Sequence, residues 1–581
     1  MTQDSEKVQT SWWKSPARHW NVLLTDGEEQ VFLVLTLLIG ALTGLMAVAF
    51  ILLTERFGSR LYPAGGATWH RLVFPVAGSL SMGYLLFRYF PEARGSGVVQ
   101  TKAALYAREG RITARTMFGK FFCTSATLAS GIPLGPEGPT VHVGAAIASV
   151  LGRNLGLRPE KVKALLPVAA AAAIAAAFNT PLGAVLFALE EVVGELHAPV
   201  LGSVVLASAT SWGMLRLLLG NDPLFKVPQY ELVNPWEFVL YAILGVAGGF
   251  LSVWFAKLLL GMRERWFLKL PRKTLWFQPV VGGVVVGLMG LFVPQVLGVG
   301  YNHVGAVLNG GMAFKLMVLL LFLKFFAVAI SYATGNAGGI FGPSLFIGAM
   351  LGGTIGSVGH HFLPGYVAAP GAYALVGMGA AFAGIVRAPM TSVVMIFEIT
   401  RDYAVIVPLM ISNLVSFFIS SRFQKETIFE ALARQDGIHL PTAETRQAEG
   451  HRQVILAMRP ATEILSGDMT LEEALDAIRS SESTAWPVRD GRGLIGVVTF
   501  GKIQQAAAAE SMPNLLKELV DSSDFPHLHT DHSLSLALER MGACQINSIP
   551  VVSRADIHKL EGVVTLKDVL SIYGVGSPEK A

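Results

Sequence analysis

The sequence has few charged residues for its length. Only 15% of its 581 residues are Asp, Glu, Lys or Arg, while 52% are hydrophobic. Typical soluble domains carry about 25% charged residues. Long stretches, 31–54, 274–314 and 325–386, contain no charged residue, and each exceeds the ~20 residues that span a bilayer core. The composition therefore predicts a polytopic membrane protein.

Cysteine is nearly absent, and so are concentrated basic tracts. Cys123 lies in an apolar segment and Cys544 near the C-terminus, so we expect neither a disulfide nor a metal site. The net charge of +4 is spread along the chain, which indicates no nucleic-acid partner. The first apolar run begins at residue 31 and lacks a small-residue cleavage site, so we interpret it as a retained span and not as a signal peptide.

Hydropathy divides the chain into two parts. Charged residues become frequent after Phe423, and from about residue 453 short β-type runs alternate with amphipathic helices. We interpret 1–30 as a cytosolic segment, 31–435 as an all-α membrane domain and 436–456 as a linker. The alternating pattern in the rest of the chain predicts a cytoplasmic α/β module.

Two spaced motifs occur twice in the membrane part. The sequence GPEGP at 135–139 is matched by GIFGP at 339–343, and PLGAVLFALE from Pro181 is matched by PMTSVVMIFE from Pro389. The spacings are 204 residues (135 to 339) and 208 residues (181 to 389). This repetition predicts two half-domains of similar plan, at about 31–220 and 235–435.

The glycine–proline motifs indicate broken helices around an anion. Irregular backbone at membrane depth is tolerated only where it is buried in protein or lines a cavity. Each motif precedes an apolar helical stretch, and we expect the proline that ends it, Pro139 or Pro343, at the first helical position. Two helix N-termini would then point free N–H groups at a cavity, as in many secondary transporters.

A third element surrounds Ser96, in the sequence Arg94-Gly95-Ser96-Gly97. A serine hydroxyl between glycines can donate a hydrogen bond to an anion without adding a full charge. Taken by itself, this motif is equally typical of a plain turn.

Together these motifs resemble those of the CLC family of chloride channels and chloride/proton exchangers. The resemblance covers about residues 30–435 and includes GSG at 95–97, GPEGPTV at 135–141, FNTPLGAVLFALEE at 178–191 and GGIFGPSLFIGAMLG at 338–352. It implies the CLC fold, an inverted repeat with broken helices and one anion pathway per subunit. It also implies a homodimer in a bacterial-type inner or plasma membrane that transports chloride.

The resemblance assigns roles to individual residues. Glu137 corresponds to the gating glutamate, whose carboxylate occupies an anion site and moves away when it is protonated. Glu191 corresponds to the internal glutamate that passes protons in exchangers, and Lys120 to a buried lysine that makes the pathway more positive. The residues expected to line the anion sites are Ser96, Gly138 through its backbone, Ile340, Phe341 and Phe429.

Three positions depart from the family pattern. Val98 and Val99 follow Gly97 where many members have Ile-Pro, and Pro136 replaces a common arginine beside the gate. Phe429 stands where the family usually places an anion-binding tyrosine, so the central site has one hydroxyl donor fewer. Weaker chloride binding and looser proton coupling would follow.

Adjacent glutamates leave the internal proton site open to two readings. Glu191 matches the family position, but Glu190 is its neighbour and is the one with a repeat counterpart, Glu398. Intramembrane carboxylates are functional by default, and we take Glu191 as the proton residue and Glu190 as the structural one. His142, His360 and His361 have no supporting constellation and are interpreted as packing or interfacial residues.

The C-terminal part resembles a tandem of CBS repeats, at 457–508 and 515–575. In members that bind adenine nucleotides, a threonine and an aspartate three residues later contact the ribose. Thr565 and Asp568 match this pattern, whereas the first copy has Thr499 followed by Lys502. An adenine nucleotide at one site per subunit is therefore the candidate ligand, and a structural module without ligand is the alternative; no cofactor is required for transport.

Two principal functions remain at this point. The presence of both Glu137 and Glu191 favours chloride/proton exchange, whereas Phe429 favours a passive voltage- or pH-gated chloride channel. Fluoride is an alternative anion, and a proline in place of Ser96 would have indicated nitrate. A membrane-bound enzyme or sensor is disfavoured, because the C-terminal module contains no nucleophile–base set, metal cluster or phosphate loop.

Overall fold

The chain forms two compact units, Met1–Leu440 and Pro441–Ala581. The structure is a computed structural model, and it describes residues 28–575 except 64, 196–199, 221, 229, 231, 439, 441–451, 480, 492, 508–514 and 522–524. Most of the expected N-terminal segment and most of the expected linker lie outside the described residues. Each unit is considered by itself.

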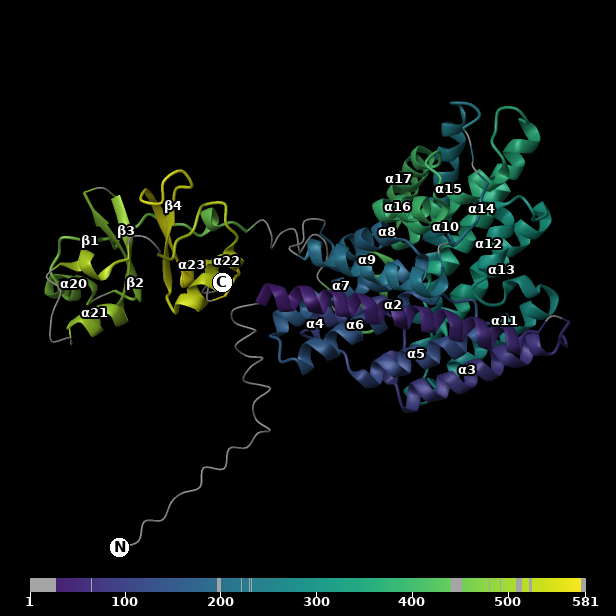
Figure 1. Ribbon diagram of the computed structural model, residues 1–581, viewed down its shortest axis with the longest axis horizontal. Coiled ribbons are helices and arrows are strands. Elements are labelled where there is room, and N and C mark those ends of the chain that lie inside the picture. Colours follow the sequence, from purple (N-terminus) through teal and green to yellow (C-terminus); the bar gives the residue numbers. More distant parts are fainter. Residues whose placement is uncertain are drawn as a thin grey trace, which may run out of the picture. The chain divides into compact units, whose positions relative to one another are not determined.

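The first unit is helical throughout its described residues (Figure 1). Within the part of the chain that the structure describes, seven helices of this unit are long and apolar enough to cross a membrane. Its first half contains α2 (Glu28–Leu61), α3 (His70–Arg88), α4 (Val98–Ala107), α5 (Ala114–Ala129), α6 (Glu137–Asn154), α7 (Pro159–Phe178), α8 (Pro181–Phe187), the π-helix η2 (Ala188–Val193) and α9 (Leu201–Leu219).

The second half repeats this order. It contains α10 (Glu237–Met262), α11 (Gln278–Phe292), α12 (Tyr301–Leu308), α13 (Phe314–Ala333), α14 (Phe341–Phe362), α15 (Pro370–Val386), α16 (Pro389–Thr400) and α17 (Ile406–Phe423), and α18 (Ile428–Gln435) follows it. The packing repeats as well, since α6 packs on α7 as α14 packs on α15, and α2 packs on α9 as α10 packs on α17. Within the membrane unit, α3 also packs on α11 and α8 on α16. The described residues of this unit are therefore helical, and its two halves follow the same plan.

Helix ends in the two halves are built by the same devices. Asn179 closes α7 and Arg387 closes α15, each with a left-handed backbone (φ 59° and 66°). Two residues later a proline occupies the first position of α8 or α16, where its missing N–H costs nothing. These sharp reversals explain why short helices follow long ones at both places.

Close helix contacts in the core depend on small residues. In α14, a Cβ on Gly348 would collide with the Gly377 carbonyl of α15. The alanine-rich α7 is buried for most of its length. Small side chains let helix backbones approach closely where lipid offers no hydrophobic driving force.

The position predicted for the motif prolines was wrong by two residues. Helix α6 begins at Glu137 and α14 at Phe341, so Pro139 and Pro343 are third in their helices and not first. Proline is still compatible with this position, because the first four N–H groups of a helix have no intrahelical acceptor.

The second unit combines two small sheets with flanking helices (Figure 1). In one, β1 (Leu465–Ser466) pairs in parallel with β2 (Ala485–Asp490), which pairs antiparallel with β3 (Gly493–Thr499); α20 (Leu471–Ile478) and α21 (Phe500–Ala507) accompany it. In the other, β4 (Ser548–Val552) pairs antiparallel with β5 (Leu560–Thr565), beside α22 (Leu534–Cys544) and α23 (Leu566–Ile572). One apolar core lies within the first repeat, and the other joins residues of the second repeat to Ala485, Leu494 and Val497 of the first.

Candidate functional site

The two repeated glycine–proline motifs meet in the middle of the membrane unit. The Gly135 N–H donates to the Gly339 carbonyl at 2.8 Å, and the Gly339 N–H donates back to the Gly135 carbonyl at 2.7 Å. This pair of hydrogen bonds joins the residues just before α6 and α14. The N-termini of both helices therefore lie side by side, with their positive dipole ends at one place.

The carboxylate of Glu137 lies at the N-terminus of the partner helix. Glu137 opens α6 and is completely buried. Its Oε2 accepts a hydrogen bond from the N–H of Gly342, the second residue of α14, at 3.2 Å, and its Oε1 accepts one from the hydroxyl of Tyr301. The side chain thus occupies a position where a free anion would be stabilised by the same donors.

The loop before α4 is pressed against the start of α6. Gly97 has φ 100°, which favours glycine, and a Cβ on it would collide with the Gly138 carbonyl. Ser96, the neighbouring residue, is 1% exposed. The structure therefore brings Ser96, Glu137 and the backbone at Gly138 together, although about 40 residues separate them in the sequence.

A buried lysine holds this loop. The Lys120 ammonium on α5 donates to the carbonyl of Ala93 at 3.0 Å and to that of Gly95. Its charge therefore lies behind the Ser96 loop, where it adds positive potential to the region around the anion.

A second buried lysine does the same in the other half, and the sequence analysis missed it. Lys324 on α13 donates to the carbonyls of Val296 at 2.9 Å and Gly298 at 2.5 Å. It stands 204 residues after Lys120, the spacing of the motifs, so the repeat itself was a signal that could have found it. Lys324 fixes the loop that leads into Tyr301, the donor to Glu137.

Aromatic rings surround Phe341 at the start of α14. Its ring lies 5.5 Å from that of Phe429 on α18 and 5.3 Å from that of Phe187 on α8, both edge-to-face. Phe429 therefore lies next to Phe341. The phenol of Tyr332 lies near Ser96, so a hydroxyl that the sequence analysis missed is close to the serine.

The adjacent glutamates of the π-helix η2 have different partners. Glu190 accepts hydrogen bonds from the N–H groups of Met390 at 3.3 Å and Thr391 at 2.8 Å, at the start of α16. Its repeat counterpart Glu398 accepts from Leu182 at 3.0 Å and Gly183 at 2.7 Å, at the start of α8. Both glutamates thus cap each other's half-domain, which explains why this pair is repeated.

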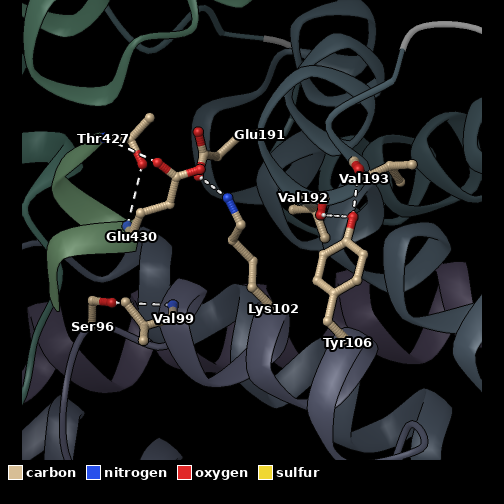
Figure 2. A network of polar contacts seen from close by, with 9 residues as sticks. All are labelled: Ser96, Val99, Lys102, Tyr106, Glu191, Val192, Val193, Thr427 and Glu430. Carbon is tan, nitrogen blue, oxygen red and sulfur yellow. Dashed lines mark hydrogen bonds and ion pairs between the residues drawn. The ribbon is translucent and has the colours of Figure 1, made fainter. Parts of the chain in front are cut away.

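Glu191 points to a different neighbour. Its Oε1 lies 2.8 Å from the ammonium of Lys102 on α4, and both side chains are about 95% buried. Figure 2 shows Lys102 reaching Glu191 from α4, with Glu430 approaching from α18. Glu190 and Glu191 are adjacent in the π-helix, yet their side chains reach different partners. Short π-helical segments of this kind are frequent at functional sites.

Two cavities flank the central region. One, of about 440 Å³, is lined by Arg94 and Gly95 of the Ser96 loop and by Tyr332, Ala333, Gly335 and Asn336 at the end of α13. The other, of about 730 Å³, is lined by residues 297–299 and by Leu128, Ala129 and Gly131 at the end of α5. The linings are repeat counterparts, so each half-domain contributes its glycine loop to one cavity and its helix end to the other.

The soluble unit contains a smaller cleft at the predicted nucleotide residues. It measures about 160 Å³, and Thr565 and Asp568 are part of its lining. Thr565 donates its hydroxyl to Asp568 Oδ2 at 2.7 Å, while Asp568 Oδ1 pairs with Arg459. In the first repeat, Thr499 accepts the Lys502 backbone N–H at 3.4 Å. The two threonines therefore have unlike surroundings.

Comparison with known proteins identifies the family. The sequence profile described as "Voltage gated chloride channel" matches residues 78–421, more than half of the chain. The chain belongs to this family. A second profile, "CBS domain", matches residues 452–508 and 516–574, in agreement with the tandem resemblance.

Individual relatives of this CLC protein are transport proteins. The "Putative chloride channel protein ClcB-like" of Ralstonia nicotianae is 33% identical over 64% of this chain and 89% of its own length. The "H(+)/Cl(-) exchange transporter ClcA" of Vibrio cholerae is 30% identical over 69% of this chain and 88% of its own. A solved "slow cyanobacterial Cl-/H+ antiporter" is 25% identical, with a TM-score of 0.65, and covers 70% of this chain and 97% of its own.

A further solved structure extends the likeness in fold to both units. A "eukaryotic CLC transporter" is 21% identical, has a TM-score of 0.60, and covers 92% of this chain and 97% of its own. The predicted fold class, a helical CLC membrane domain followed by a CBS module, is thereby confirmed.

Proposed function

We propose that this protein is a secondary active transporter that exchanges chloride for protons, with Glu137 as its gate. The observation that carries this proposal is the position of the Glu137 carboxylate, which accepts the Gly342 N–H at the N-terminus of α14. A chloride ion and an ionised carboxylate would compete for these donors. Protonation removes the charge, so the side chain leaves and the anion can occupy its place.

Glu191 supplies the second proton-handling group in this proposal. It is buried on η2. Glu191 pairs with Lys102, whereas the neighbouring Glu190 caps α16, so Glu191 has no capping role here. A passive channel has no need of such a carboxylate. The names of the Vibrio and cyanobacterial relatives, both exchangers of chloride and protons, support the same reading.

The anion would reach the central region through the two cavities. We infer that they open to opposite sides of the membrane, because an inverted repeat relates them. The transport unit would be residues 31–435, working as a homodimer in a bacterial inner or plasma membrane with the CBS module in the cytoplasm. Residues expected to contact the anion are Ser96, Gly138, Ile340, Phe341 and Phe429, with Lys120 setting the potential.

A passive chloride channel is the second candidate, and Phe429 favours it. One experiment separates the two functions: the protein is reconstituted in liposomes, and a chloride gradient is imposed across a membrane with a proton gradient of the opposite sense. An exchanger moves protons against their own gradient. Chloride flux without proton uptake would establish the channel and overturn the exchanger.

We further propose one adenine-nucleotide site in each CBS module, at Thr565 and Asp568. The cleft of about 160 Å³ is smaller than the roughly 300–1,000 Å³ typical of small-molecule sites. Binding therefore requires Arg459, whose side chain is 67% exposed, to leave Asp568 and turn toward the phosphates. We expect ATP, ADP or AMP to raise the melting temperature, and Asp568→Ala to abolish this rise. No shift at millimolar nucleotide would identify the module as structural.

A further inference from the structure

The ion pair of Lys102 and Glu191 is the feature of the membrane unit that the anion site leaves unexplained. The two groups are joined at 2.8 Å and are almost completely buried. Removing charges from water costs several kcal/mol per ion, which their attraction offsets only in good geometry. Such a pair is a poor device for stability, since well-packed apolar residues often serve as well.

The other charged groups around Glu191 are mostly negative. Glu430 approaches from α18 and Glu190 is adjacent on η2, and both disfavour a negative charge on Glu191. Arg387, at the end of α15, interacts with Glu191 and Glu430, but it is also held by the backbone carbonyls at residues 420, 424 and 425. From α7, apolar side chains face this segment, namely Val168, Ala171 and Ala172.

Lys102 is therefore the cation in direct contact with Glu191. An opposite charge at this distance strongly favours the ionised carboxylate. Without it, a buried carboxylate beside two other carboxylates would hold its proton at neutral pH and release it only at alkaline pH. A group that cannot release its proton cannot pass one on.

We propose that Lys102 is the positioning residue of the internal proton site, keeping Glu191 able to both bind and release a proton during transport. The proposal rests on the exchange function above. Lys102 touches neither chloride nor the transferred proton in this account. It acts through Glu191, and it lies on α4, the helix that follows the Ser96 loop.

The test is the pH profile of chloride-driven proton uptake in liposomes, measured with the full-length protein. In Lys102→Met, we expect uptake to be lost near neutral pH and to recover at alkaline pH, with the profile moved upward by about 1–3 pH units. Chloride flux should persist. Lys102→Arg retains the charge and should restore the original profile. An unchanged profile in Lys102→Met would overturn the proposal.

A matched control comes from the same helix. The Tyr106 hydroxyl donates to the Val193 carbonyl at 2.5 Å and so also ties α4 to η2, without a charge (Figure 2). Tyr106→Phe should leave the pH profile in place. If Tyr106→Phe and Lys102→Met reduce uptake equally without moving the profile, the ion pair is merely a packing contact and the proposal fails.

Glu191→Gln separates this inference from the proposed function. If proton uptake survives in Glu191→Gln at every pH, Glu191 is not a proton-transfer residue, and the proposed role of Lys102 fails as well. Uptake that is abolished in Glu191→Gln but unchanged in Lys102→Met would refute the role of Lys102 alone. If Lys102→Met does not fold, the double variant Lys102→Met/Glu191→Gln leaves no unpaired charge, and its chloride flux should have the same pH dependence as that of Glu191→Gln. A further change in the double variant would show that Lys102 acts elsewhere.

Discussion

The two half-domains share their scaffold more closely than their chemistry. Lys120 and Lys324 each hold a glycine loop through two carbonyls, and Glu190 and Glu398 cap each other's short helix. Backbone N–H groups, carbonyls and buried lysines are thus duplicated. These are the parts that create a positive environment, which needs no particular direction.

The groups that can take a proton or contact an anion through a hydroxyl are not duplicated. Glu137 has Phe341 as its counterpart 204 residues on, Ser96 has Val299, and Glu191 has Ile399. The second half instead contributes Tyr301, where the first has Val98. The repeat therefore supplies the backbone donors and buried lysines of the site twice, whereas the gating carboxylate of Glu137 occurs in the first half and has an apolar counterpart in the second.

Among the substitutions that test the difference between the two halves, we expect Glu137→Gln to have the largest effect on transport. The amide mimics the protonated gate, so chloride flux should persist while proton coupling and pH dependence are lost. In the native protein, flux should rise as pH falls, because protonation removes the competing charge. Liposome flux and proton uptake measure both, and Phe341→Leu at the counterpart position should retain coupling. Flux through Glu137→Gln that still falls steeply with rising pH would contradict the gating role.

Substitution of Lys120 and of Lys324 should affect stability alike but transport differently. Lys120→Met and Lys324→Met each leave two buried carbonyls without their donor, at a cost of about 1–3 kcal/mol for each unsatisfied group. We expect similar losses of melting temperature. Lys120→Met should also weaken chloride binding in calorimetry, whereas Lys324→Met should alter the pH dependence of gating, because its loop leads to Tyr301. Equal effects on chloride affinity would show that the halves are functionally equivalent.

Tyr301→Phe should have a smaller effect, a shift in the pH at which the gate opens. A hydrogen bond to a charged group is worth about 1.5–3 kcal/mol, and its loss disfavours the ionised, seated carboxylate. The pH dependence of chloride flux should therefore shift upward by about 1–2 units. Val98→Ala, at the counterpart position, is the control and should leave the profile in place. A downward shift would mean that Tyr301 favours the open gate.

The smallest effect is expected from Phe429→Tyr, which adds the hydroxyl that this sequence lacks. Chloride affinity should rise by at most the ~1.5–3 kcal/mol of one hydrogen bond to an ion. The gain should be reduced because the Tyr332 phenol already lies at Ser96. The same substitution in a Tyr332→Phe background should therefore give a larger gain in calorimetry. Equal affinity in all variants would exclude Phe429 from the anion site.

Much of the plan was predictable from local patterns. Glycine and proline break helices wherever they occur, so the repeated motifs predicted two halves and broken helices at fixed spacings. The family resemblance, and not their register, assigned Glu137, Ser96 and Phe341 to the anion site, while the repeat of Glu190 in Glu398 indicated a structural pair, and each of the two carboxylates accepts N–H groups at the start of a helix in the other half. Lys324 carried the same signal, since it follows Lys120 at the motif spacing.

Partners distant in the chain were decided by the tertiary structure. No local pattern pairs Gly135 with Gly339, Tyr301 with Glu137 or Lys102 with Glu191, because each contact depends on how helices far apart in sequence pack. The sequence by itself determined where helices are broken and which residues carry charge, since these follow from backbone sterics and composition. Which charge meets which was determined only in the folded protein, where removal from water makes a single close partner decisive.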